Sequence, residues 1–142
     1  MIFKRKHRIS KTIKFTPTIG NSLYDITSLI ELTIDNYGLK NRLVNIHVQA
    51  STAAILIQEN GDSRVKRDLI HFLQNLIQSN LIDKFNQDNY NEANVKAALI
   101  GPSKTIPVIK GKLALSKCQK IFFCEFDEPN IEREILITPF RN

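Results

Sequence analysis

The 142-residue chain has no tryptophan, one methionine, two cysteines, five glycines and five prolines. With 42% hydrophobic and 24% charged residues, this composition excludes collagen-like, low-complexity and disordered proteins. No run approaches the roughly eighteen apolar residues of a membrane span, and the basic start is not followed by the apolar segment of a secretory signal. These absences predict one globular domain over residues 1–142, with no membrane partner.

Cysteine is too sparse and too poorly placed for a disulfide framework. Cys118 and Cys124 fall in what reads as one extended strand, where two side chains six residues apart are too distant to bond each other. The chain is therefore expected to be reduced and cytoplasmic.

Acidic residues are missing from the first fourteen positions, which hold six cations: Lys4, Arg5, Lys6, Arg8, Lys11 and Lys14. The other fourteen cations equal the fourteen acids in number, so the net charge of +6 belongs to this arm. Residues 1–16 are expected to form a basic arm and a strand whose lysines discourage edge-to-edge pairing. The alternative is contact with nucleic acid, an anionic ligand or a neighbouring subunit, although the stacking aromatics of single-strand binders are lacking.

Apolar spacing predicts three helices. The first has a capping box at Thr27, Ser28 and Glu31 and ends at Gly38. The second is capped by Asp62 or Ser63 and packs one apolar stripe on a sheet: Val65, Leu69, Phe72, Leu73 and Leu76. The third runs from about 91 to 100 and ends at Gly101.

β-Branched and alternating segments predict strands at 9–16, 43–49 and 53–59, the last two being adjacent strands or one long bent strand. Residues 105–109 and 112–115 flank Lys110 and Gly111 as a hairpin. Residues 120–126 and 132–138 are expected to form a looser hairpin around 127–131. The polar stretch from 80 to 92 is longer than a typical connection, and loops of this size often carry function.

Motifs for nucleotide binding and nucleophilic catalysis are absent: there is no serine elbow, Walker loop or glycine-rich dinucleotide motif. No cysteine or histidine pair has metal-ligand spacing. His7 lies in the basic arm, and His71 is expected to face water. His47 alternates with Asn45 and Gln49, on either a wet outer surface or the wall of a pocket.

Polar residues at strand and helix ends form the remaining candidates for ligand binding, although each alone fits a cap or turn. They are Ser51, Thr52, Glu59, Asn60, Asn94, Lys96, Ser103, Gln119 and Glu125.

Several of these candidates lie in segments that resemble the YjbQ-like family. The run from Ser51 to Ile55 with Glu59, Asn60, Val65 and Asp68 resembles its central motif, and 93–103 resembles a later segment that ends in Gly-Pro-Ser. Similar family segments correspond to Asp25–Thr27, to Ile106, Pro107, Gly111, Leu113 and Leu115, and to Gln119, Ile121, Phe122 and 124–127.

The resemblance implies an α+β domain, mostly an antiparallel β-sheet sandwich with two or three packed helices, and a homotrimer. It also implies a histidine-lined metal cleft and a secondary thiamine-phosphate synthase activity, which joins a pyrimidine diphosphate to a thiazole phosphate. The chain departs from the family at these histidines, because Ala50 and Asn94 stand in two of their places and no histidine lies between 80 and 92. The family's Trp-Gln-Gly motif reads Cys118, Gln119 and Lys120.

These departures predict a remodelled cleft without a transition metal, which binds a phosphorylated small molecule with little or no family-type catalysis. Lys96 and the amides near Ser103 would hold the phosphate if they face one cleft. Any remaining activity would be that of a thiamine-phosphate synthase-like transferase. Mg²⁺ is expected only with a diphosphate substrate. Two alternatives stay open: a basic-arm module that contacts nucleic acid or partner subunits, and a rebuilt metal site, for example at His47 and Glu59.

Overall fold

The computed structural model describes residues 10–80 and 90–140. In chain order, the elements are β1 (Lys11–Phe15), β2 (Ser22–Asp25), α1 (Thr27–Tyr37), β3 (Arg42–Val48), β4 (Ala53–Glu59), α2 (Ser63–Asn80), α3 (Tyr90–Ile100), β5 (Ser103–Ile109), β6 (Lys112–Leu113), β7 (Gln119–Glu125) and β8 (Arg133–Pro139).

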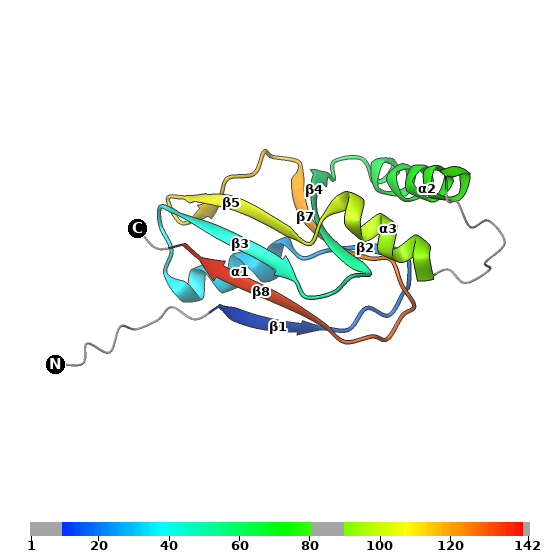
Figure 1. Ribbon diagram of the computed structural model, residues 1–142. Helices are drawn as coiled ribbons and strands as arrows, with labels where there is room; N and C mark the ends of the chain where they lie inside the picture. Colours follow the sequence, from blue (N-terminus) through cyan, green and yellow to red (C-terminus); the bar gives the residue numbers. More distant parts are fainter. Residues whose placement is uncertain (1–9, 81–89, 141–142) are drawn as a thin grey trace.

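The strands form two antiparallel sheets (Figure 1). One has five strands in the order β1-β8-β3-β5-β6, and the other has three in the order β2-β7-β4. Asn45 of β3 lies between Thr105 of β5 and Thr138 of β8, and Ile55 of β4 opposes Phe123 of β7. The chain passes from one sheet to the other at most connections, so strands that follow each other in sequence are rarely partners.

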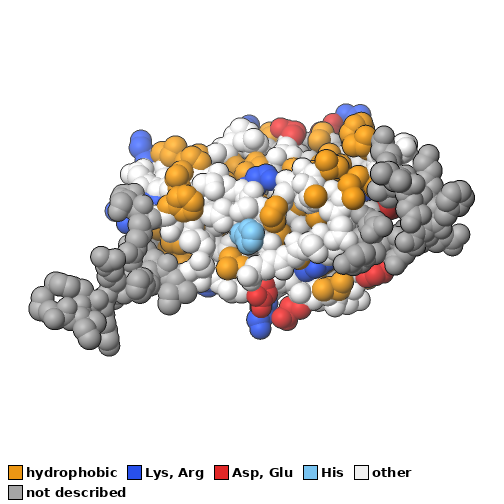
Figure 2. All heavy atoms as spheres, viewed as in Figure 1, with side chains coloured by type: hydrophobic (Ala, Val, Ile, Leu, Met, Phe, Trp, Pro, Cys, Tyr) orange, Lys and Arg blue, Asp and Glu red, His pale blue; other side chains and the backbone are white. Residues whose placement is uncertain are grey.

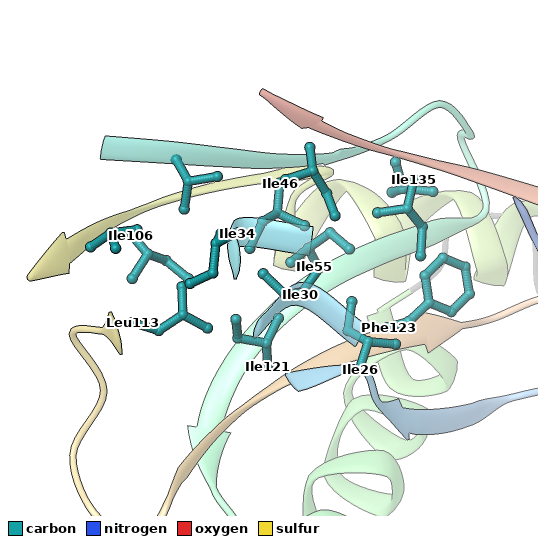
Figure 3. Packing of buried hydrophobic residues seen from close by; sticks show 14 of the residues in the cluster. Ile26, Ile30, Ile34, Ile46, Ile55, Ile106, Leu113, Ile121, Phe123 and Ile135 are labelled. Atoms are coloured by element: carbon teal, nitrogen blue, oxygen red, sulfur yellow. The ribbon is translucent and has the colours of Figure 1, made fainter. Parts of the chain in front are cut away.

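An isoleucine-rich core fills the space between the two sheets (Figure 3). Helix α1 contributes Ile26, Ile30 and Ile34 to this core. A second core lies on the other side of the three-stranded sheet, under α2 and α3, where Leu73 and Ala97 meet the sheet. The fold therefore has three layers: the five-stranded sheet, the three-stranded sheet with α1 beside it, and the pair α2 and α3.

Strand β7 is buried on both faces because it is the middle strand of the middle layer. Ile121 and Phe123 belong to the core between the sheets, whereas Phe122 and Cys124 belong to the core under the helices. Burial raises the pKa of the Cys124 thiol from 9.0 to about 12. These layers confirm the predicted α+β sandwich.

Most of the predicted elements are confirmed, with shifts of one or two residues at their ends. Helix α1 ends at Gly38, whose φ of 64° is the left-handed conformation that closes a helix. Asp62 caps α2, since its Oδ1 accepts the backbone N–H of Arg64 at 2.9 Å. Residues 43–49 and 53–59 are two strands in different sheets rather than one bent strand.

The capping box predicted for α1 is wrong. The N-cap is Ile26, and it makes no side-chain cap hydrogen bond. The Thr27 hydroxyl instead donates to Asp25 Oδ1 at 2.6 Å and accepts the Ile121 backbone N–H at 2.9 Å. A tertiary contact to β7 therefore uses the oxygen that a cap would need.

The predicted hairpin of residues 120–126 and 132–138 is also wrong, because β7 and β8 lie in different sheets. Strand β7 needs a layer on each face, whereas β8 alternates buried residues such as Ile135 with half-buried ones such as Leu136. The connection between them packs closely: a Cβ added at Gly20 would lie 2.6 Å from the Asp127 carbonyl oxygen.

The apolar stripe predicted for the second helix is only partly buried. Leu73 is buried and Leu69 is half-buried, but Val65, Phe72 and Leu76 are exposed, Phe72 by 63%. Helix α2 is turned so that Ile77 is buried in their place. The stripe is therefore not the face that packs on the sheet.

Candidate functional site

The structure divides the predicted site residues between the two ends of the β4–β7 pair. Ala53 opposes Glu125 at one end, beside Ser51 and Thr52, and Glu59 opposes Gln119 at the other. Strand β4 covers seven residues, which span about 20 Å at the usual rise of a strand. These candidates therefore do not form one cleft.

Glu125 and Thr52 belong to a buried ion-pair network between the sheets. The Glu125 side chain is fully buried, and its two oxygens accept from Arg133 Nε at 2.8 Å and Nη2 at 2.5 Å. Arg133 Nη2 also donates to Thr52 Oγ1 at 2.8 Å, and the Asp127 N–H donates to Glu125 Oε1 at 3.2 Å. With its oxygens committed to these donors, Glu125 joins β7 to β8 rather than facing a ligand.

Lys96 lies on the opposite face of the three-stranded sheet, in the core under the helices. Its side chain is buried, and Nζ donates to Gln74 Oε1 and, at 3.4 Å, to Asn21 Oδ1. The ammonium also lies 6.0 Å from the ring centre of Phe126. Burial lowers the pKa of Lys96, and the charge of Glu92 opposes that shift.

No carboxylate in the described part of the chain forms an ion pair with Lys96. Glu92 is linked to Lys96 through Gln74, because Glu92 Oε2 accepts a hydrogen bond from Gln74 Nε2 at 3.2 Å. Lys96 is thus a buried cation held by the oxygens of neutral amides, which is an unusual environment for a buried charge.

A groove of about 420 Å³ opens beside the two amides that hold Lys96, and we call it the α2 groove. Its lining residues are Asn21, Ser63, Lys66, Arg67, Ile70, His71 and Gln74. Lys66 and Arg67 are its cations; the neighbouring Arg64 is already paired with Asp62, its Nη2 2.7 Å from Oδ2. The α2 groove is thus a hollow beside the Lys96 amides whose charged lining residues are cations.

Two of the α2 groove residues are named in the sequence predictions: Ser63 as a possible helix cap, and His71 as a side chain that faces water. The other residues carried no motif, and Asn21 lies far from α2 in sequence. The one available signal was the spacing of Lys66, Ile70 and Gln74, which are four residues apart and so share a helix face.

Ser103 lies elsewhere, on the outer face of the five-stranded sheet. Its Oγ accepts from Asn45 Nδ2 at 2.8 Å. His47 is half-buried and opposes Ser103 across the β3–β5 ladder. Because Lys96 contacts α2 and the loop before β2, Lys96 and Ser103 do not share a cleft.

This outer face carries apolar and uncharged polar side chains, with most charges near its margins (Figure 2). Its exposed apolar residues include Leu43, Ile109 and Phe140. The cations Lys4, Arg5, Lys6 and Arg8 of the basic arm and His7 lie outside the described residues, and so does most of the polar stretch from 80 to 92.

Two of the positions at which the resemblance implies histidine ligands lie in the described residues, and neither offers an imidazole. Ala50 offers only a methyl group, which packs against the core between the sheets. Asn94 offers an amide on α3, where it is half-buried. Across residues 10–80 and 90–140, no three histidine, cysteine or acidic side chains are grouped to hold a metal ion.

The helices of the described residues include none long and apolar enough to cross a membrane.

Comparisons with known proteins agree with this fold. A family model described as UPF0047 protein YjbQ-like matches residues 11–142. A UPF0047 protein of Methanocaldococcus jannaschii is 37% identical over 129 residues, which cover 91% of this chain and 87% of the relative. A Bacillus subtilis UPF0047 protein is 31% identical, with 84% of this chain and 90% of the relative covered.

Two crystal structures share the architecture. One is an uncharacterized conserved protein of the YjbQ/UPF0047 family from Clostridium acetobutylicum, with a TM-score of 0.83 and 28% identity over 92% of this chain and 99% of that one. The other is a protein of unknown function from Sulfolobus solfataricus, with a TM-score of 0.82 and 28% identity over 92% of this chain and 95% of that one. The chain therefore belongs to the YjbQ-like UPF0047 family.

Proposed function

We propose that this protein binds a phosphorylated small molecule in the α2 groove, without a transition metal and with little or no thiamine-phosphate synthase-like turnover. The observation that carries the proposal is Lys96, a buried cation whose hydrogen-bond acceptors are the neutral amides of Gln74 and Asn21. A buried charge is stabilised by a counter-charge, and an anionic ligand in the adjoining groove supplies one.

The polar atoms along the α2 groove favour an anion. Asn21 directs Oδ1 to Lys96, so the Nδ2 of the same planar amide points away from the ammonium and can donate to a ligand. Lys66 and Arg67 add two cations, and the Ser63 hydroxyl adds a donor. Cations and amide donors of this kind bind phosphate. The volume of 420 Å³ suits a small ligand.

Little in the groove supports transfer chemistry. Glu125 is locked by Arg133 on the other face of the sheet, and His71 is exposed and bonded to Asn75 at 3.2 Å. General acid–base catalysis needs a titratable group within hydrogen-bond reach of the reacting atoms. The charged lining residues of the groove are cations, which suits the binding of a phosphate or pyrophosphate more than catalysis of the reaction that releases pyrophosphate.

Calorimetric titration tests the proposal with two probes, inorganic pyrophosphate and thiamine phosphate. We expect the pair Lys66→Ala and Arg67→Ala, or Lys96→Met alone, to weaken binding of the bound probe at least tenfold, or about 1.4 kcal/mol. A matched control removes two cations from β1, Lys11→Ala with Lys14→Ala, and should leave binding unchanged. If neither probe binds, or the control weakens binding as much, the proposal is wrong. Rescue of a thiamine auxotroph would overturn the proposed loss of catalysis.

We further propose that the protein is a homotrimer, as the family resemblance implies. Leu43, Ile109 and Phe140 are 43%, 54% and 42% exposed where the neighbouring strands β3, β5 and β8 begin or end, which suits burial against a second copy. Light scattering should give three times the 16.3 kDa mass, and Leu43→Glu should lower it. A wild-type monomer at micromolar concentration would exclude the trimer.

The alternative hypothesis is that the basic arm contacts nucleic acid or partner subunits. For nucleic acid, it predicts binding that weakens steeply with salt and is lost when Lys4, Arg5, Lys6 and Arg8 are neutralised. Binding of that kind, together with no binding of pyrophosphate or thiamine phosphate, would favour the arm over the α2 groove.

A further inference from the structure

A second hollow, of about 640 Å³, lies between α1 and the segment that leads from the β5–β6 hairpin to β7. We call it the hairpin groove. One wall is acidic: Glu31 and Asp35 follow each other one turn apart on α1, and both are exposed. The opposite wall is basic, with Lys110, Lys112, Lys117 and Lys120 along the hairpin and the start of β7. The hollow shares no residue with the α2 groove.

The two walls do not neutralise each other directly. The ion pairs of the described residues are Lys14–Glu132, Arg64–Asp62 and Arg133–Glu125, and none of them joins the two walls of this groove. Helix α1 also has no basic residue in its last turn. Its C-terminal dipole therefore adds to the negative potential at Asp35. Opposite charges line a space large enough for a ligand.

Two apolar side chains also line the groove. Leu113 is buried and Leu115 is half-buried, and both line the hollow. On the basic side, Gln119 Oε1 accepts the Ser116 backbone N–H at 2.9 Å. This bond turns the Gln119 amide so that Nε2 remains a donor beside the lysines. The groove thus has acidic side chains that attract a cation, basic side chains that attract an anion, and two leucines in its lining.

We propose that the hairpin groove binds a small amphoteric molecule, with a primary ammonium against Glu31 and Asp35 and a phosphate or carboxylate against Lys117 and Lys120. Ligands of one sign suit the groove less, because a bare phosphate also faces the acids and a bare amine also faces the lysines. An aliphatic link between the charged groups covers Leu113 and Leu115. The site is separate from the phosphate site at Lys96, so either proposal can fail alone.

Titration of the full-length protein, followed by backbone amide NMR, tests this site with two probes: O-phosphoethanolamine and 6-aminohexanoate. We expect at least one probe to shift amides of both walls and to bind at least tenfold more tightly than inorganic phosphate, acetate or ethylamine. The two probes also separate phosphate from carboxylate as the anionic group.

Variants that neutralise the charges of one wall at a time test whether both walls contact the probe. Glu31→Gln with Asp35→Asn, and separately Lys117→Gln with Lys120→Gln, should each weaken binding of that probe at least tenfold. Lys11→Gln with Lys14→Gln, which removes two cations from β1, should leave binding unchanged. The inference is overturned if neither probe gives a saturable shift, if the one-sign ligands bind equally well, or if only the lysine variant has an effect.

Discussion

Replacing Arg133 by methionine should strongly destabilise the protein, because it leaves a buried carboxylate without its partner. Glu125 has no exposed surface, and Arg133 supplies two of its hydrogen bonds. Among the described residues, the donor that then remains to Oε1 is the Asp127 N–H, at 3.2 Å. Thr52 Oγ1 loses a partner as well. Breaking a buried ion pair from one side costs about 3–5 kcal/mol, which is the loss expected for Arg133→Met.

A second variant separates what the Glu125–Arg133 ion pair contributes to the free energy of unfolding from the cost of leaving one buried charge without its partner. Glu125→Leu combined with Arg133→Met removes both charges and leaves apolar side chains of similar volume. Such replacements are often neutral or stabilising, and the buried Thr52 hydroxyl, which loses its Arg133 partner, costs about 1 kcal/mol. The double variant should therefore lie within about 2 kcal/mol of the wild type, well above the single variant.

The assay is urea unfolding followed by far-ultraviolet circular dichroism, since the chain has no tryptophan to report on the transition. Protein concentration must be constant because assembly would add to the apparent stability, and the denaturant dependence should be the same for all variants. A loss below about 1 kcal/mol for Arg133→Met, or a double variant as unstable as the single one, would refute the reasoning.

Three further outcomes are expected from the same unfolding assay. The Cys124 thiol, with its pKa raised to about 12, keeps its proton in the folded state after the unfolded chain has lost it. This thiol should therefore contribute a fall in stability above about pH 9, of up to about 1.4 kcal/mol per pH unit, so Cys124→Ala should be less destabilised than the wild type as the pH rises. Lys96 contributes with the opposite sign, because its lowered pKa means that the unfolded chain binds more protons just below pH 10.5. Lys96→Met lacks this contribution and should lose more stability than the wild type as the pH rises there. Finally, Phe72→Ser should cost less than about 0.5 kcal/mol, whereas Leu73→Ala should cost about 2–5 kcal/mol; equal losses would contradict the orientation of α2.

Local signals explain which parts of the fold were predictable. The end of α1 at Gly38 and the cap of α2 at Asp62 depend on neighbouring residues alone, so their sequence patterns were sufficient. The sequence patterns were not sufficient to assign β7 and β8 to different sheets, because strand pairing depends on residues far apart in the chain. A short connection favours a hairpin, but the apolar residues on both faces of β7 required a middle layer, and only the full fold shows where that layer is.

The candidate site was less predictable for the same reason. Lys96 was singled out, but its partners Gln74 and Asn21 are 22 and 75 residues away in sequence, and no motif links them. Glu125 was also singled out, but its polar character reflects an ion pair with Arg133 rather than a role with ligand. A polar residue at a strand end looks the same in sequence whether it faces a groove or another strand.

The three-stranded sheet separates these two roles in space, and this separation makes them independently testable. Glu125 faces the core between the sheets, and Lys96 faces the core under the helices. Both are buried charges, but Glu125 is paired with the guanidinium of Arg133, whereas Lys96 is hydrogen-bonded to neutral amides. Removing charge should therefore destabilise the protein at Arg133 and leave stability equal or higher at Lys96, since a poorly compensated buried cation opposes folding. An anionic ligand in the α2 groove should reverse that second effect, because it adds a negative charge near an ammonium that forms no ion pair within residues 10–80 and 90–140.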